Sequence, residues 1–140
     1  MREDEYKGIL AEHWLEKGED ALESAVLELK GGHKEAAVNR CYYACFYAFS
    51  AVLTRAGRRF RKHAAVRAAL NRDYVKKGII PRELGRLYNM LFLNRERADY
   101  QPLARFEYET IRRWIYEIRG FIDWCRKYVD IAEGNEGDRK

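Results

Sequence analysis

The chain has 140 residues, the length of one domain, and its 47% hydrophobic and 35% charged residues exclude an intrinsically disordered protein. A net charge of +5 permits contact with phosphate groups without requiring it. No apolar run approaches the roughly 20 residues of a membrane-spanning helix, and the charged start, MREDEYKG, does not resemble a signal peptide. We therefore expect a cytoplasmic protein that does not enter a membrane.

Two long helices are predicted in the first part of the chain. Apolar residues recur every three or four positions over 5–30, and the glycine pair that follows is typical of a helix end. A second helix is predicted over 34–57. It is apolar almost all round, so we expect it to be the central and most buried helix. Its clearly polar residues between positions 36 and 53 are Asn39, Arg40 and Ser50.

The middle of the chain predicts two further helices. A third helix is expected over about 62–77, with Gly78 after it. Pro81 begins a fourth helix, because the first helical position needs no N–H donor. This helix is expected to run to about residue 98.

Pro102 is expected to open a fifth helix over 103–131. The tail, 132–140, ends in the polar run EGNEGDRK and is expected to be flexible, which leaves a helical domain over 1–131. No stretch alternates as a strand would. The sequence therefore predicts an all-α, up-and-down bundle of about five helices, with consecutive helices antiparallel.

Five residues inside the predicted helices bear on packing and on the redox state. Gly85 and Gly120 each cost about 1 kcal/mol against alanine in a helix, so we expect a close helix–helix approach at both. The cysteines cannot all pair, and two of them lie four residues apart in the most apolar helix. We interpret Cys41, Cys45 and Cys125 as reduced core residues.

An arginine stands in an apolar helix face within LYNMLFLNRERADY. Arg95 shares that face with Tyr88, and Asp99 follows one turn later. Arg40 likewise stands in an apolar face of the second helix. Because an unpaired buried charge costs about 3–5 kcal/mol, we expect Asp99 to neutralise Arg95, Arg40 or both. The cluster fits a structural ion pair, and it also fits a polar site that uses arginine to hold phosphate.

Three blocks carry a resemblance to a known family: EAAVNRCYYACFYAFSAVL, RKHAAV and KGIIPRELGRLYNMLFLNRERADY. In this order they resemble the HEPN superfamily, and they are most similar to its small stand-alone prokaryotic branch, over roughly residues 6–130. The matching residues are Ala37, Arg40, Tyr42, Tyr43, Ala44 and Phe46, then Lys62 and His63, then Arg95 or Arg97 with Ala98, Asp99 and Tyr100. The resemblance implies a HEPN-like helical bundle that forms homodimers. It also implies work beside a minimal nucleotidyltransferase, as a toxin with its antitoxin.

Active HEPN toxins are metal-independent ribonucleases with an R-x4-6-H motif, in which arginine holds a phosphate and histidine transfers a proton. This chain departs from that motif, because Tyr100, Gln101 and Pro102 fill the histidine window counted from Arg95. Arg58 and His63 fit the spacing but lie before the third helix. The residues therefore leave open whether the protein is an enzyme.

Two functions remain open from the sequence. The first is a non-catalytic nucleotide- or RNA-binding module that acts with a nucleotidyltransferase partner. Its binding residues would be Arg40, Tyr43, Lys62, His63, Arg95 and Asp99. The second is a ribonuclease toxin with a degenerate motif, in which Arg95 holds the phosphate and Tyr100, or the His63 of a dimer mate, transfers the proton. The helix register does not decide whether Arg95 or Arg97 faces the site.

The remaining sequence features suggest no metal or cofactor. The histidines at positions 13, 33 and 63 lie in different segments, and none has the spacing of a helical metal-ligand pair. The motifs of phosphate-binding and dinucleotide-binding loops are absent from the sequence. The basic run TRAGRRFRKH, 54–63, fits contact with an RNA backbone and fits a solvated loop equally well.

Overall fold

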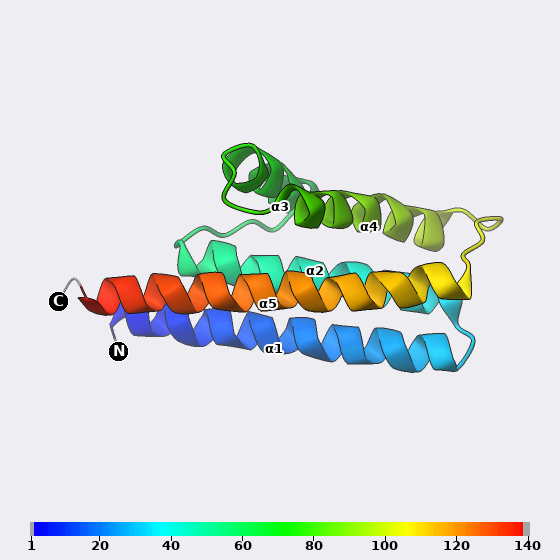
Figure 1. Cartoon of the computed structure of the whole chain (residues 1–140), viewed down its shortest axis with the longest axis horizontal. Helices are drawn as coiled ribbons and strands as arrows, with labels where there is room; N and C mark the ends of the chain where they lie inside the picture. Colours follow the sequence, from blue (N-terminus) through cyan, green and yellow to red (C-terminus); the bar gives the residue numbers. More distant parts are fainter. Residues whose placement is uncertain (1, 139–140) are drawn as a thin grey trace.

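A computed structural model describes residues 2–138, with side chains described to residue 132. Within that range the chain is helical and has no strand, which confirms the predicted all-α bundle (Figure 1). The elements are α1 (Glu3–Lys30), α2 (Lys34–Arg55), α3 (His63–Ala69), the π-helical turn η1 (Leu70–Val75), α4 (Arg82–Tyr100) and α5 (Tyr108–Asp138).

Helix α2 is the centre of the bundle, as its almost continuous apolar sequence predicts. It packs against α1, α4 and α5, and α4 lies on the side of α2 away from α1 (Figure 1). Its large buried side chains include Tyr42 and Phe49, both fully shielded from solvent. Each neighbouring helix contributes one apolar face to the core, so α2 fixes the relative positions of the others.

The segment between α4 and α5 differs from the prediction. The fifth helix begins at Tyr108, so Pro102 does not open it. The segment starts with a turn, in which the amide of Ala104 donates to the carbonyl of Gln101 at 3.0 Å. Phe106, 9% exposed, then packs into the core outside any helix. Helical periodicity in the sequence does not predict this contact, because Phe106 is buried by tertiary packing and not by its place on a helix face.

The third predicted helix also changes character. It is α-helical only to Ala69 and continues as the π-helical turn η1. The turn keeps two apolar side chains, Leu70 and Tyr74, inside the core. Gly78, at φ +74°, ends this segment as predicted.

The two helical glycines have different environments. A Cβ added at Gly85 would lie 2.6 Å from Cγ2 of Val75, so the close approach predicted there is confirmed. A Cβ added at Gly120 would meet no described atom within 4 Å, so the same prediction is wrong for Gly120. Sequence periodicity does not distinguish Gly85 from Gly120, because the difference is whether a side chain of another segment packs against the glycine.

We expect Gly85→Ala to lower the free energy of unfolding by about 1–3 kcal/mol, because the new methyl group overpacks against Val75. Gly120→Ala is the matched control and should raise it by up to about 1 kcal/mol, since alanine is the better helix former. Urea denaturation of both variants checks this. Equal changes in the two variants would contradict the packing difference.

The three cysteines are buried and unpaired, as predicted. Burial raises the pKa of Cys41 to about 12, so its thiol stays protonated and unreactive at neutral pH.

Helix α5 continues to Asp138, while residues 139–140 lie outside the described residues. The division into a domain over 1–131 and a flexible tail over 132–140 therefore stays a prediction. None of the described helices has the length and apolar character that crossing a membrane requires.

Candidate nucleotide-binding site

Helix α4 turns Arg95 toward the bundle, and Arg97 away from it. The Arg95 side chain is only 14% exposed, and its guanidinium lies over the rings of Tyr42, at 5.0 Å, and Tyr43, at 5.9 Å. Arg97 is exposed and lies over Phe106 instead, at 5.3 Å. Of the two arginines that the sequence left open, Arg95 is therefore the one that faces the bundle.

Asp99 pairs directly with only one of the two candidate arginines. Its Oδ2 lies 3.4 Å from Nη1 of Arg95. Asn39 lies between Asp99 and Arg40: its amide donates to both Asp99 oxygens at 3.3 and 3.4 Å, and its Oδ1 accepts from Arg40 Nη2 at 2.8 Å. The pair with Arg95 that we predicted is present, and the link to Arg40 runs through Asn39.

Arg40 and Arg95 share an aromatic support. The Arg40 guanidinium lies 4.9 Å from the centre of the Tyr43 ring, and Arg95 lies over Tyr42 beside it. Such contacts hold a guanidinium in place without neutralising its charge. Asp99 is the carboxylate that pairs with Arg95, and Glu28 and Glu35 line the same hollow as Arg40 and Asp99.

His63, the first residue of α3, is held by aromatic rings rather than by a helix cap. Its ring stacks on Phe46 with centres 4.3 Å apart and planes 7° apart. Its Nδ1 lies 2.7 Å from the hydroxyl of Tyr42. Tyr42 therefore connects His63 to Arg95, which lies over the same ring. Tyr42 matches the family pattern in the sequence, but it was not predicted as a binding residue, because packing explains an aromatic side chain in an apolar helix equally well.

The surroundings of His63 keep its imidazole neutral at pH 7. Burial, and then the positive charge of Arg95, lower the pKa of His63 below its ordinary value. Burial raises the pKa of Tyr42 to about 12, so its phenol keeps its proton. With Nδ1 bound to this hydroxyl, Nε2 is the ring nitrogen to which no described residue bonds, and it is the one suited to proton transfer.

Two of the predicted site residues lie outside this cluster. Tyr100, the last residue of α4, is 74% exposed, and no described contact joins it to Arg95. Lys62 precedes α3 and is exposed. The structure thus brings together five of the predicted residues, and it adds Asn39 and Tyr42. The five are Arg40, Tyr43, His63, Arg95 and Asp99. Among the described residues no group of three or more acidic, histidine or cysteine side chains is placed to hold a metal ion.

Protein stability should depend on the proton equilibrium of His63. Because the pKa of His63 is lower in the folded state, the unfolded state binds the proton more tightly. The stability contribution is complete above about pH 6.5, the ordinary pKa of histidine, and is lost as the pH falls toward the lower folded value. We expect the urea midpoint to fall between pH 7.5 and pH 5.5, and to fall less in His63→Gln. Equal falls in both proteins would contradict this role.

The protein is an all-α bundle in which two arginines and a histidine contact the aromatic residues of the central helix α2. The family model for the HEPN domain matches residues 11–128. A UPF0332 protein of Thermotoga maritima is 41% identical over 121 residues, which cover 86% of this chain and 92% of that protein. The chain therefore belongs to the HEPN domain family, as the resemblance of its three sequence blocks suggested.

Two archaeal relatives have more specific names. Both come from Methanocaldococcus jannaschii. "Putative toxin MJ0142" is 25% identical over 132 residues, covering 92% of this chain and 90% of that protein. "Putative toxin MJ0605" is 30% identical over 113 residues, covering 81% and 84%. The similarity to both proteins includes most of the helical bundle.

Proposed function

We propose that this chain is the HEPN component of a toxin–antitoxin pair, and that it binds a nucleotide or RNA phosphate at Arg95. In this proposal a minimal nucleotidyltransferase is its partner, and the chain forms a homodimer. The names of the two archaeal relatives support the toxin–antitoxin role. Membership of the HEPN family supports the homodimer, because HEPN-like bundles commonly form homodimers.

The observation that carries the phosphate proposal is the environment of Arg95. Its side chain is almost fully desolvated, yet its only carboxylate partner among the described residues lies 3.4 Å away. Its Nε is buried and donates to no described group. A guanidinium held this way keeps donors for a phosphate oxygen, and the desolvated setting strengthens the charge-assisted hydrogen bonds it would form. Arg40, next to it, adds a second positive charge.

Binding of RNA in chelator tests this function. We expect a fluorescently labelled single-stranded hexanucleotide to bind the purified protein with an affinity that falls as salt rises, because phosphate contacts release counterions. Anisotropy measures the affinity, and a gel of the same samples reports whether the RNA stays intact. Absence of binding to the hexanucleotide at low salt would contradict the proposal.

A second candidate function, a metal-independent ribonuclease, is supported by the position of His63. The sequence offered Tyr100 or a dimer mate's His63 as the proton-transfer group. The chain's own His63 is connected to Arg95 through Tyr42, and burial and Arg95 lower the pKa of His63; this supports a proton-transfer group from the same chain. A general acid or base typically contributes about 10²–10⁴-fold to a reaction rate.

The gel assay separates the two functions. If the protein is a ribonuclease, it cleaves RNA in chelator, and His63→Gln lowers the rate by about a hundredfold or more. His33→Gln, which changes an exposed histidine before α2, is the matched control and should cleave as the natural protein does. Intact RNA at saturating protein would exclude the ribonuclease and leave the binding function.

A further inference from the structure

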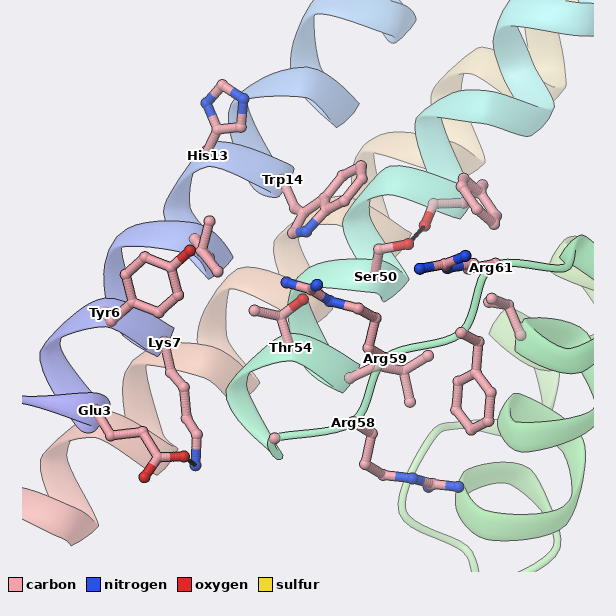
Figure 2. Close-up of a pocket in the computed structure, with 16 residues that line it drawn as sticks. Glu3, Tyr6, Lys7, His13, Trp14, Ser50, Thr54, Arg58, Arg59 and Arg61 are labelled. Carbon is pink, nitrogen blue, oxygen red and sulfur yellow. Dashed lines mark hydrogen bonds and ion pairs between the residues drawn. The ribbon is translucent and has the colours of Figure 1, made fainter.

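A cavity of about 450 Å³ opens between α1, the end of α2 and the connection that follows α2 (Figure 2). Its walls come from the first half of α1, from the last turns of α2 and from the connecting residues 57–61. Neither Arg40 nor Arg95 lines it. It is therefore distinct from the Arg95 site.

Two arginines at the cavity have no acidic partner among the described residues. Arg58 is engaged with Asp73, since their Nη2 and Oδ2 atoms lie 2.8 Å apart, and Lys7 lies 3.6 Å from Glu3. For Arg59 and Arg61 no described carboxylate lies within ion-pair distance, and both are exposed. In Figure 2 the Arg59 guanidinium points toward Thr54 and Trp14, and the Arg61 guanidinium points toward Ser50. The cavity rim thus keeps two free positive charges.

The cavity also has an aromatic wall. Trp14 and Tyr6 line it from α1, and Phe60 lines it from the connection. The Trp14 ring is fixed by stacking on Tyr47, with centres 5.7 Å apart. Fixed aromatic rings next to free arginines are the combination with which proteins bind single-stranded nucleic acid, because bases stack on the rings while the arginines contact the backbone.

The cavity and the Arg95 site share a wall. Phe46 lines the cavity and also stacks on His63, at 4.3 Å between ring centres. Val66, one turn after His63 on α3, lines the cavity as well. The cavity and His63 are therefore neighbours on either side of the Phe46 ring.

We propose that this cavity is a second subsite for single-stranded RNA, which holds a nucleotide near the one whose phosphate Arg95 binds. The inference rests on the proposed function, and it makes RNA rather than a mononucleotide the ligand. Bases stack against Trp14, and Arg59 and Arg61 contact the phosphates. In this proposal a dinucleotide bound at Arg95 leaves the cavity empty, whereas a hexanucleotide fills both subsites.

The test compares a hexanucleotide with a dinucleotide of single-stranded RNA, both fluorescently labelled, by anisotropy. The variant is Arg59→Ala with Arg61→Ala. Its matched control, Arg113→Ala with Arg119→Ala, removes two exposed arginines from α5. Helix α5 starts at the opposite end of the bundle from the start of α1 (Figure 1). Both variants lose the same net charge.

We expect the Arg59/Arg61 variant to bind the hexanucleotide about tenfold or more weakly. Its salt dependence, the slope of log K against log salt, should fall by about 1.4, or 0.7 for each lost contact with single-stranded phosphate. Its affinity for the dinucleotide should not change, and the control should bind both ligands within about twofold of the natural protein. Trp14→Leu, with its helical circular dichroism confirmed, should weaken only hexanucleotide binding, by about fivefold or more.

The outcomes distinguish this inference from the proposed function. If the Arg59/Arg61 variant matches its control, the second subsite is refuted, whatever happens at Arg95. If Arg95→Ala leaves both affinities unchanged while the cavity variants weaken the hexanucleotide, the cavity binds RNA and the phosphate role of Arg95 fails. If neither oligonucleotide binds the natural protein, both proposals are overturned.

Discussion

Arg95→Ala is expected to lower the affinity for single-stranded RNA by about 10- to 100-fold. The guanidinium is held over Tyr42 and Tyr43, so it is positioned before a ligand arrives and loses little entropy on binding. Hydrogen bonds to charged groups are worth about 1.5–3 kcal/mol, and 1.4 kcal/mol corresponds to a factor of ten. The measurement is the anisotropy titration of the labelled hexanucleotide.

Arg97→Ala is the matched control for this prediction. It removes the same charge from the same helix two residues later, but the Arg97 guanidinium donates to Asn94 and lies over Phe106. We expect its affinity to stay within about threefold of the natural protein. Equal losses of RNA affinity in the two variants would contradict a specific phosphate contact of Arg95, because any positive charge on α4 would then have the same effect.

Tyr42→Ala is expected to lower the free energy of unfolding by about 3–5 kcal/mol, the range for large aromatic side chains in a core. Tyr42 is fully buried and its ring contacts rings from α2, α3 and α4. The substitution leaves a cavity at the junction of these helices. It also removes the ring on which Arg95 rests. Chemical denaturation gives the loss.

Two variants identify the source of the Tyr42 effect. Tyr42→Phe keeps the ring under Arg95 but removes the hydroxyl that holds His63, so it should cost only about 1–3 kcal/mol and leave RNA affinity nearly unchanged. Tyr43→Ala, at the half-buried neighbour, should cost less than Tyr42→Ala. A loss for Tyr42→Phe as large as for Tyr42→Ala would show that the hydroxyl matters more than the packing of the ring.

Most of the fold could be predicted because local periodicity determines it. The apolar run in α2 gives the most buried helix of the bundle, and the glycines after α1 and η1 mark real ends. The start of α5 could not be predicted, because Phe106 reaches the core from an irregular segment. The π-helical turn after Ala69 was missed for a related reason: its register depends on packing with neighbouring segments.

Five residues of the candidate cluster could be chosen from the sequence, but the contacts that join them could not. Arg95 and Asp99 could be paired from their spacing on one helix. The connections through Asn39 and Tyr42 join residues far apart in sequence, so only the packing of α3 and α4 on α2 reveals them. Tyr100 was attractive because it fills the position of a motif histidine, yet a residue at the end of α4 lies exposed. The histidine that does approach Arg95 comes from the start of α3.

The central claim is that Arg95 holds an RNA phosphate, and the most direct test is the NMR signal of its own side-chain N–H. The Arg95 Nε is buried and donates to no described group, so a bound phosphate should change its surroundings strongly. We expect the Arg95 Nε–H resonance to shift on titration with the RNA hexanucleotide, while that of Arg97 stays in place. A shift at Arg97 alone, or no shift at Arg95 once RNA is saturating, would contradict the account.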